Sequence, residues 1–138
     1  MPINSSILLT SMDERGVMTL TLNRPDAFNA MSEALLEALQ ASITQMSEDP
    51  NLRVVVIQAN GKAFCAGHDL KEMRAQPSDA YYRDLFARCS QVMMGLQNLP
   101  VPVIAKVHGL ATAAGCQLVA QCDLAVSSDN ATFAVSGV

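Results

Sequence analysis

Two segments rich in small residues each follow a short apolar strand and precede a predicted helix. Residues 64–70 (Phe-Cys-Ala-Gly-His-Asp-Leu) follow the apolar run 54–57, and residues 108–117 (His-Gly-Leu-Ala-Thr-Ala-Ala-Gly-Cys-Gln) follow the run 103–107. Glycine and alanine let a ligand approach the backbone closely, and the first N–H groups of a helix have no partner within it. On neighbouring strands, two such turns would aim two N–H groups at one point, where they would stabilise negative charge on an oxygen. This pairing predicts an α/β fold with a site at the two turns.

The remaining periodicity completes an α/β pattern. It predicts strands at residues 7–10, 17–22, 54–59, 103–107 and 123–127, and helices at residues 32–47, 70–74, 78–99 and 113–121. Ser32 is a good N-cap, and Phe86 falls on the apolar stripe of the third helix. Repeated β–α–β crossovers imply a largely parallel sheet, in which strand 54–59 is covered on both faces. We expect one domain over residues 1–138.

Composition excludes several classes of protein. Half of the 138 residues are hydrophobic and only 16% are charged, which is typical of a globular chain. The net charge of −4 argues against a nucleic-acid partner, and no apolar run reaches the roughly 20 residues that span a membrane. Residues 1–6 lack a targeting pattern, so we expect a cytoplasmic protein. The four cysteines have no CxxC spacing and only two histidines accompany them, which predicts buried thiols and no metal site.

The last residues resemble the beginning of another element. Residues 130–138 resemble an entry into a strand, and the chain stops at the apolar Val138 without a cap or polar tail. An α/β domain that ends in this way would leave apolar surface exposed. Either a partner chain covers this surface or these residues are the front part of a longer protein, and we expect the second.

Four segments together resemble the crotonase superfamily of enoyl-CoA hydratases and isomerases. They are residues 62–73 and 103–123, with Leu-Asn-Arg-Pro at 22–25 and Asn-Ala-Met at 29–31 upstream. The resemblance implies a crotonase-like spiral of ββα units with a largely parallel sheet, truncated before the C-terminal helices. It also implies an acyl-CoA ligand, no separate cofactor because coenzyme A is part of the substrate, and assembly as a homotrimer or a dimer of trimers.

The resemblance places a reaction site at the two turns. The two oxyanion-hole N–H groups correspond to His68 and Ala114. The two glutamates of the hydratases correspond to Gln117 and Gly137 here. Glutamine does not ionise and glycine has no side chain, so the two-glutamate hydration mechanism has no residues to use. Gln117 retains the capacity to orient a water molecule or a substrate carbonyl.

The resemblance also implies where coenzyme A binds. Its adenine and pantetheine portions would lie along residues 24–27 and 63–70, with contacts from Arg24, Ala27, Ala63, Ala66, Gly67, Asp69 and Leu70. Lys62 and Lys71 are candidates for phosphate contacts, although a solvated lysine is the commoner role. Other roles stay open for two of these residues. Asp69 is placed to cap the following helix, and the His68 ring is expected to be packed or to point outward while its backbone serves the site.

Three functions are compatible with these residues. The first is an enzyme of the enoyl-CoA hydratase/isomerase type that binds an acyl-CoA and polarises its thioester carbonyl, with a reaction other than standard hydration. The second is a non-catalytic acyl-CoA-binding or regulatory homologue. The third, a purely structural assembly partner, predicts no affinity for coenzyme A.

Overall fold

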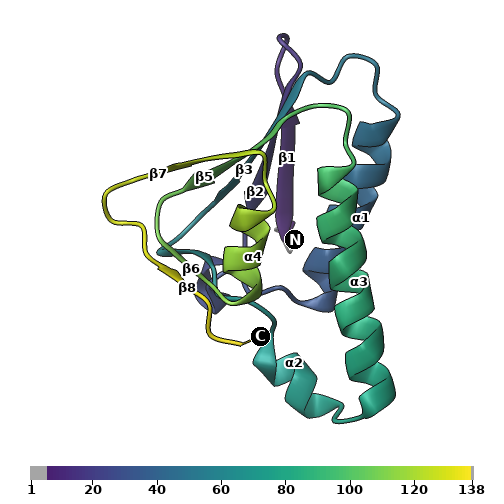
Figure 1. The fold of residues 1–138 in the computed structure, drawn as a ribbon, viewed down its shortest axis with the longest axis vertical. Coiled ribbons are helices and arrows are strands. Elements are labelled where there is room, and N and C mark those ends of the chain that lie inside the picture. The colour runs from purple at the N-terminus through teal and green to yellow at the C-terminus, as the bar shows by residue number, and fades with distance from the viewer. Residues whose placement is uncertain (1–5, 138) are drawn as a thin grey trace, which may run out of the picture.

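The computed structural model describes residues 6–137, which form two sheets and a set of helices (Figure 1). The larger sheet has the order β1-β2-β3-β5-β7, and only β1 and β2 are antiparallel neighbours. Its strands are β1 (Leu8–Met12), β2 (Val17–Leu22), β3 (Val54–Ala59), β5 (Val103–Val107) and β7 (Leu124–Ser127). The smaller sheet is parallel and consists of β4 (Ala63–Cys65), β6 (Leu110–Thr112) and β8 (Phe133–Ala134).

Consecutive strands alternate between the two sheets after the first hairpin. β3, β5 and β7 enter the larger sheet, and the strand that follows each of them, β4, β6 or β8, enters the smaller one. A helix follows each of the first three strand pairs, which is the repeated ββα arrangement that the resemblance implied. The prediction of an α/β fold with a mostly parallel sheet is therefore confirmed.

The helices α1 (Glu33–Ser47), α2 (Leu70–Ala75) and α3 (Asp79–Gln97) begin at polar residues that cap them. The other described helices are η1 (Pro25–Ala27) and α4 (Ala114–Ala120). Ser32 accepts a hydrogen bond from the Leu35 N–H at 3.2 Å, and Ser78 accepts one from the Tyr81 N–H at 3.1 Å. Each cap satisfies an N–H group that the helix itself leaves unpaired. By contrast, α4 begins without a side-chain cap.

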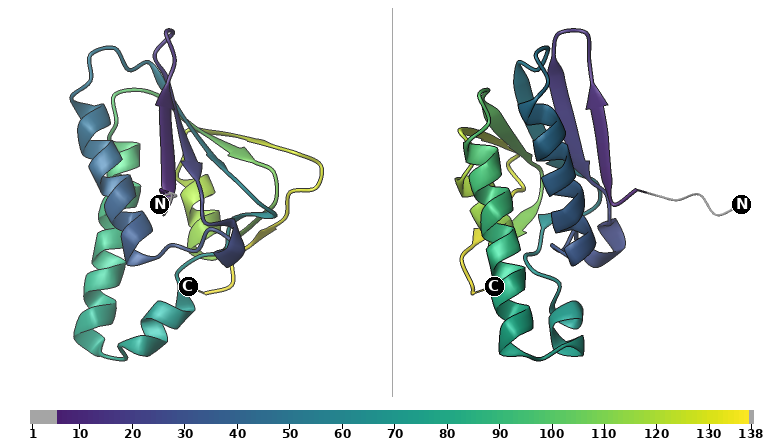
Figure 2. Two further views of the ribbon diagram at one scale, coloured as in Figure 1. Left: turned by 180° about the vertical axis from the view of Figure 1, so that it is seen from behind. Right: turned by 90° about the vertical axis from the view of Figure 1, so that its right-hand side faces the viewer.

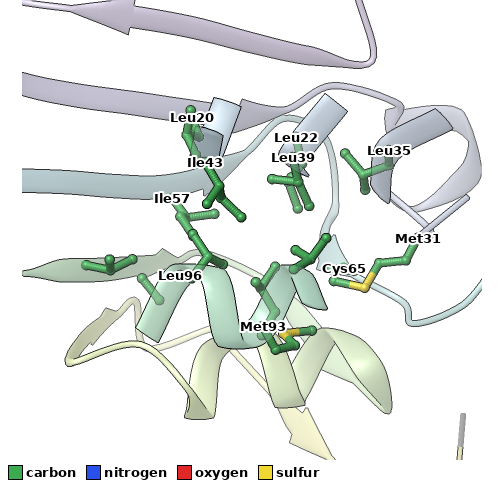
Figure 3. Packing of buried hydrophobic residues seen from close by; sticks show 14 of the residues in the cluster. Leu20, Leu22, Met31, Leu35, Leu39, Ile43, Ile57, Cys65, Met93 and Leu96 are labelled. Atoms are coloured by element: carbon green, nitrogen blue, oxygen red, sulfur yellow. The ribbon is translucent and has the colours of Figure 1, made fainter. Parts of the chain in front are cut away.

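The hydrophobic core lies between the larger sheet and the helices α1 and α3, which run side by side (Figures 1 and 2). Figure 3 shows apolar side chains from β2, β3, α1 and α3 meeting there, among them Leu20, Leu22, Leu39, Ile57, Met93 and Leu96. Complete burial of one such side chain contributes about 1.5–3 kcal/mol to stability. The core thus fixes the strands whose ends lead into the two turns.

The structure corrects three expectations. Residues 63–65 and 110–112 are short strands, whereas the sequence predicted only turns there. Strand β3 alternates between buried and half-buried residues, so one face is not fully covered. Phe86 lies off the buried stripe of α3 and is 36% exposed. None of the described helices is both long and apolar enough to cross a membrane.

Candidate functional site

The two turns lie next to each other because the strands that lead into them are neighbours. β3 pairs with β5 in the larger sheet, and β4 pairs with β6 in the smaller one, both in parallel. Gly115 of α4 lies so close to β4 that a Cβ atom at that position would be 2.1 Å from the carbonyl oxygen of Cys65. Only glycine permits this approach, so tight packing is one reason for the small residues of the second turn.

The first turn presents the N–H group of His68. The backbone of Met31 donates to the carbonyl oxygen of Gly67 at 2.7 Å, and its own carbonyl oxygen accepts from the Asp69 N–H at 3.4 Å. Both bonds use the residues that flank His68. The His68 N–H itself has no hydrogen-bond partner among residues 6–137.

The second turn presents the N–H group of Ala114. Ala113 precedes it with φ 55° and ψ −124°, a backbone conformation that non-glycine residues rarely adopt. The Ala113 N–H donates to the carbonyl oxygen of Ala134 at 3.0 Å and so ties the turn to β8. Ala114 is the first residue of α4, and no acceptor for its N–H is found in the described chain.

A cavity of about 410 Å³ brings the two turns together. It is lined by His68, Phe86, Ala113, Ala114, Cys116, Gln117, Ala120, Val135 and Gly137. The four residues that the sequence analysis proposed for the reaction site therefore line the same cavity. They are His68, Ala114, Gln117 and Gly137. The described lining residues include no carboxylate.

The His68 ring is packed rather than outward-pointing. The residue is 7% exposed, and its ring meets the Phe86 ring edge-on, with the centroids 5.1 Å apart and an interplanar angle of 83°. Its Nδ1 atom is buried and has no hydrogen-bond partner within the described residues. Burial lowers the pKa of His68 because it disfavours the charged form.

Gln117 and Gly137 are far apart in the sequence, but both line the same cavity. Gly137 has φ +84°, and nothing lies within 4 Å of a Cβ atom built there. Space is therefore available at this position, while the backbone conformation disfavours any other residue.

A second cavity, of about 270 Å³, is lined by several of the residues predicted to contact coenzyme A. Its lining consists of Arg24, Asp26, Ala27, Phe28, Ala30, Asp69, Leu70 and Lys71. Lys71 thus borders this cavity, whereas Lys62 lies outside its lining. Phe28, which the sequence analysis did not nominate, exposes its ring here on a backbone with φ 52°.

Asp69 has a structural role in this second cavity. Its Oδ1 atom accepts from the N–H groups of Lys71 and Glu72 at the start of α2, and Oδ2 lies 3.0 Å from Nη1 of Arg24. Burial alone would raise the pKa of Asp69, but the backbone hydrogen bond from Glu72 and the Arg24 side chain outweigh it and lower that pKa. The alternative role of helix cap, left open by the sequence, is confirmed.

Three residues that the resemblance implied as coenzyme A contacts stay outside both cavities. Ala63, Ala66 and Gly67 line neither of them. The Ala66 N–H donates to the carbonyl oxygen of Phe28 at 3.1 Å, so it is already occupied. Gly67 has φ +96°, which explains why glycine stands there.

The Asn29 side chain connects segments that are distant in the sequence, and the sequence analysis missed its role. The buried side chain donates to the carbonyl oxygens of Asn60 at 2.8 Å and Ala63 at 3.0 Å. It also accepts from the Arg24 N–H at 2.8 Å. Its φ of 54° is tolerated better by asparagine than by most residues. No local signal in the sequence indicated this role, because the two carbonyl oxygens that Asn29 binds lie more than 30 residues away.

Comparison with known proteins identifies the family. The enoyl-CoA hydratase/isomerase family matches residues 12–138, which is most of the chain. The chain belongs to this family. Its relatives include the enoyl-CoA hydratase domain-containing protein 3, mitochondrial, of Xenopus laevis, which is 48% identical over 95% of this chain and 45% of its own length. The human protein of the same name is 48% identical over 89% of this chain and 41% of its own length.

Solved structures agree with this assignment. A crystal structure of enoyl-CoA hydratase from Mycobacterium smegmatis superimposes with a TM-score of 0.93 at 66% identity, and covers 94% of this chain and 51% of that one. The crotonase fold is therefore shown. The chain spans about half the length of the curated relatives it matches.

The comparison overturns the expected cytoplasmic location. The relatives from Xenopus laevis, Rattus norvegicus and Homo sapiens are all named mitochondrial. The expectation was wrong because it rested on the lack of a targeting pattern in residues 1–6. The residues that form the core and the cavities carry no information about the compartment.

Proposed function

We propose that the chain provides the thioester site of an acyl-CoA-binding protein, with the carbonyl oxygen held between the N–H groups of His68 and Ala114. The observation that carries this proposal is that His68 and Ala114, whose N–H groups have no partner among the described residues, line one cavity. Two fixed donors favour the form of the ligand in which negative charge develops on the oxygen. In enzymes one such donor contributes about 2.7–4 kcal/mol in the transition state.

The second cavity is our proposed location for part of coenzyme A. Arg24 and Lys71 supply positive charge, and the exposed Phe28 ring supplies an apolar surface beside them. Asp69 is engaged by Arg24 and by the start of α2, so it contributes to the wall rather than to phosphate binding. No separate cofactor is required in this proposal, because coenzyme A arrives as part of the ligand.

Membership of the family supports an enzyme, and the proposed reaction is not standard hydration. General acid–base catalysis needs ionisable groups at the reacting carbon atoms, and Gln117 and Gly137 offer none. Polarisation of the thioester followed by a different reaction remains the leading function. The cavity without a described carboxylate also favours a second candidate, a homologue that binds acyl-CoA without converting it.

A panel of acyl-CoA thioesters tests these proposals on the full-length protein, with binding and turnover measured for each compound. Turnover of any member supports the enzyme. Tight binding without turnover supports the non-catalytic homologue. Failure of every thioester to bind would contradict both.

Removal of one donor tests the oxyanion site directly. Ala114→Pro deletes the N–H at the first position of α4, where proline is otherwise tolerated. We expect the turnover of a converted thioester to fall about a hundredfold or more. Ala114→Gly retains the donor and serves as the control. Equal turnover of the proline variant and the control would place the carbonyl elsewhere.

Hydration of crotonyl-CoA should be inefficient, because both carboxylates are absent together. We expect a rate far below the ~10 per second of an ordinary enzyme, measured as loss of absorbance of the conjugated thioester. Gln117→Glu alone should recover little, since paired catalytic groups act as a unit. Gly137→Glu has space but costs about 1–2 kcal/mol of backbone strain at φ +84°. A wild-type rate near ordinary values would show that another residue supplies the proton chemistry.

A further inference from the structure

The polar side chains of the first cavity are few and uncharged. His68 and Gln117 are its only polar side chains apart from the Cys116 thiol, among the described residues that line it. The remaining lining is alanine, glycine, valine and the Phe86 ring. A ligand group placed here meets no negative charge from the described wall.

The His68 ring is built to stay neutral. Protonation would place an N–H on both ring nitrogens, and each would need an acceptor. The buried Nδ1 atom has none in the described chain, and the Phe86 ring closes one side of the imidazole. Burial lowers the pKa of His68 in the same direction. A neutral ring therefore persists at physiological pH.

The proton of the neutral ring belongs on Nε2. A buried N–H without an acceptor is rarer in proteins than an acceptor whose lone pair is unused. With Nδ1 enclosed and unpartnered, the favourable tautomer leaves Nδ1 as the unused acceptor and makes Nε2–H the donor. The His68 side chain then offers a hydrogen bond to the cavity that it lines.

Gln117 complements this donor. Its amide group carries two N–H donors and does not ionise at any physiological pH. It lies on the exposed face of α4 and borders the same cavity as His68. The two side chains thus supply donors beyond the pair of backbone N–H groups.

We infer that the acyl portion of the ligand carries a second hydrogen-bond-accepting oxygen beyond its thioester, a keto or carboxylate oxygen, which the His68 and Gln117 side chains hold. The inference rests on the proposed thioester site. A simple alkyl or enoyl chain would leave the buried His68 side chain without a partner, and a site with a buried polar group discriminates against such a chain.

Matched thioesters test the inference on the unmodified full-length protein by calorimetry. Butyryl-CoA is the plain compound, acetoacetyl-CoA adds a keto oxygen, and malonyl-CoA and succinyl-CoA add a carboxylate at two distances. We expect at least one acceptor-bearing thioester to bind about tenfold or more tightly than butyryl-CoA. Equal affinities across the set would overturn this inference and leave the thioester site standing. No binding by any compound would overturn both.

Two variants identify the residues responsible. His68→Phe retains the backbone N–H and the ring packing but removes the side-chain donor, so the affinity ratio of the best acceptor-bearing thioester to butyryl-CoA should fall towards one. Gln117→Glu lies on an exposed position and should fold even where His68→Phe does not. It should weaken malonyl-CoA or succinyl-CoA about tenfold relative to acetoacetyl-CoA by charge repulsion. Unchanged ratios in both variants would overturn the assignment.

Nitrogen NMR of histidine-labelled protein gives a readout independent of binding. We expect the His68 ring to show the neutral Nε2–H tautomer between about pH 7 and 8, because burial lowers its pKa. A ring that becomes protonated in this range, or that carries its proton on Nδ1, would contradict the donor role.

Discussion

The two turns that border the first cavity are held in place by different interactions. Hydrogen bonds fix the turn at His68, through the backbone of Met31 and the capping carboxylate of Asp69. Close packing of main chain fixes the turn at Ala114, because Gly115 lies against the Cys65 carbonyl group. The hydrogen-bonded turn should therefore respond to polar substitutions and to pH, and the packed turn to added volume. Three predictions test this difference.

The largest effect is expected at the packed turn. In Gly115→Ala the new Cβ atom would meet backbone atoms of Cys65 that no rotamer change can move away. We expect the free energy of unfolding to fall by at least about 3 kcal/mol, measured by chemical denaturation of the full-length protein.

Gly95→Ala is the matched control, since it is also a helical glycine. A Cβ atom there would meet only the side chain of Ile43, at 3.1 Å, and alanine gains about 1 kcal/mol of helix propensity. Its stability should stay within about 1 kcal/mol of the parent protein. Similar losses in both variants would show that the contact with Cys65 is not special.

An intermediate effect is expected from the support of the hydrogen-bonded turn. Asn29→Ala leaves two carbonyl oxygens and the Arg24 N–H without their partner and should cost about 2–3 kcal/mol. Asn60→Ala removes only an exposed hydrogen bond to Asn23 and should cost under about 0.5 kcal/mol. Thermal unfolding of both variants provides the comparison, and a stable Asn29→Ala protein would show that packing holds this turn too.

The smallest effect is expected at Asp69. Asp69→Asn retains a good N-cap but loses the ion pair with the partly exposed Arg24, so stability at pH 7 should fall by less than about 1 kcal/mol. Because folding lowers the pKa of Asp69, its contribution is present above the ordinary carboxylate range and is lost as the pH falls below about 4.

The difference between the two proteins should therefore become smaller in acid. Urea unfolding at pH 7 and pH 3 measures it. A difference that grows as the pH falls would have the wrong sign for a lowered pKa and would exclude the carboxylate as the cause.

Much of the fold could be predicted from local pattern. The helix at 33–47 follows from its apolar stripe and the Ser32 cap, and strand 54–59 was placed correctly by its apolar run. β4 and β6 were missed because each is three residues long and gains its stability from a partner far along the chain.

Some residues of the candidate site could also be predicted from the sequence, and others could not. His68, Ala114, Gln117 and Gly137 could be nominated because they lie in the segments that carry the family resemblance. Phe86 could not, since one face of α3 buries its neighbours while this ring turns to the His68 imidazole. The orientation of a side chain such as Phe86 depends on contacts between elements that are distant in the sequence, and local periodicity does not reveal these contacts.

The contact of Gly115 with β4 has a consequence for how this protein can diverge. The approach of α4 to β4 is set by main-chain atoms of Gly115 and Cys65, so side-chain replacement elsewhere on α4 does not alter it. The same helix also borders the cavity with Cys116, Gln117 and Ala120, and substitutions at these positions would not disturb that contact. The residues around the proposed thioester site can therefore change one at a time while this main-chain contact stays the same.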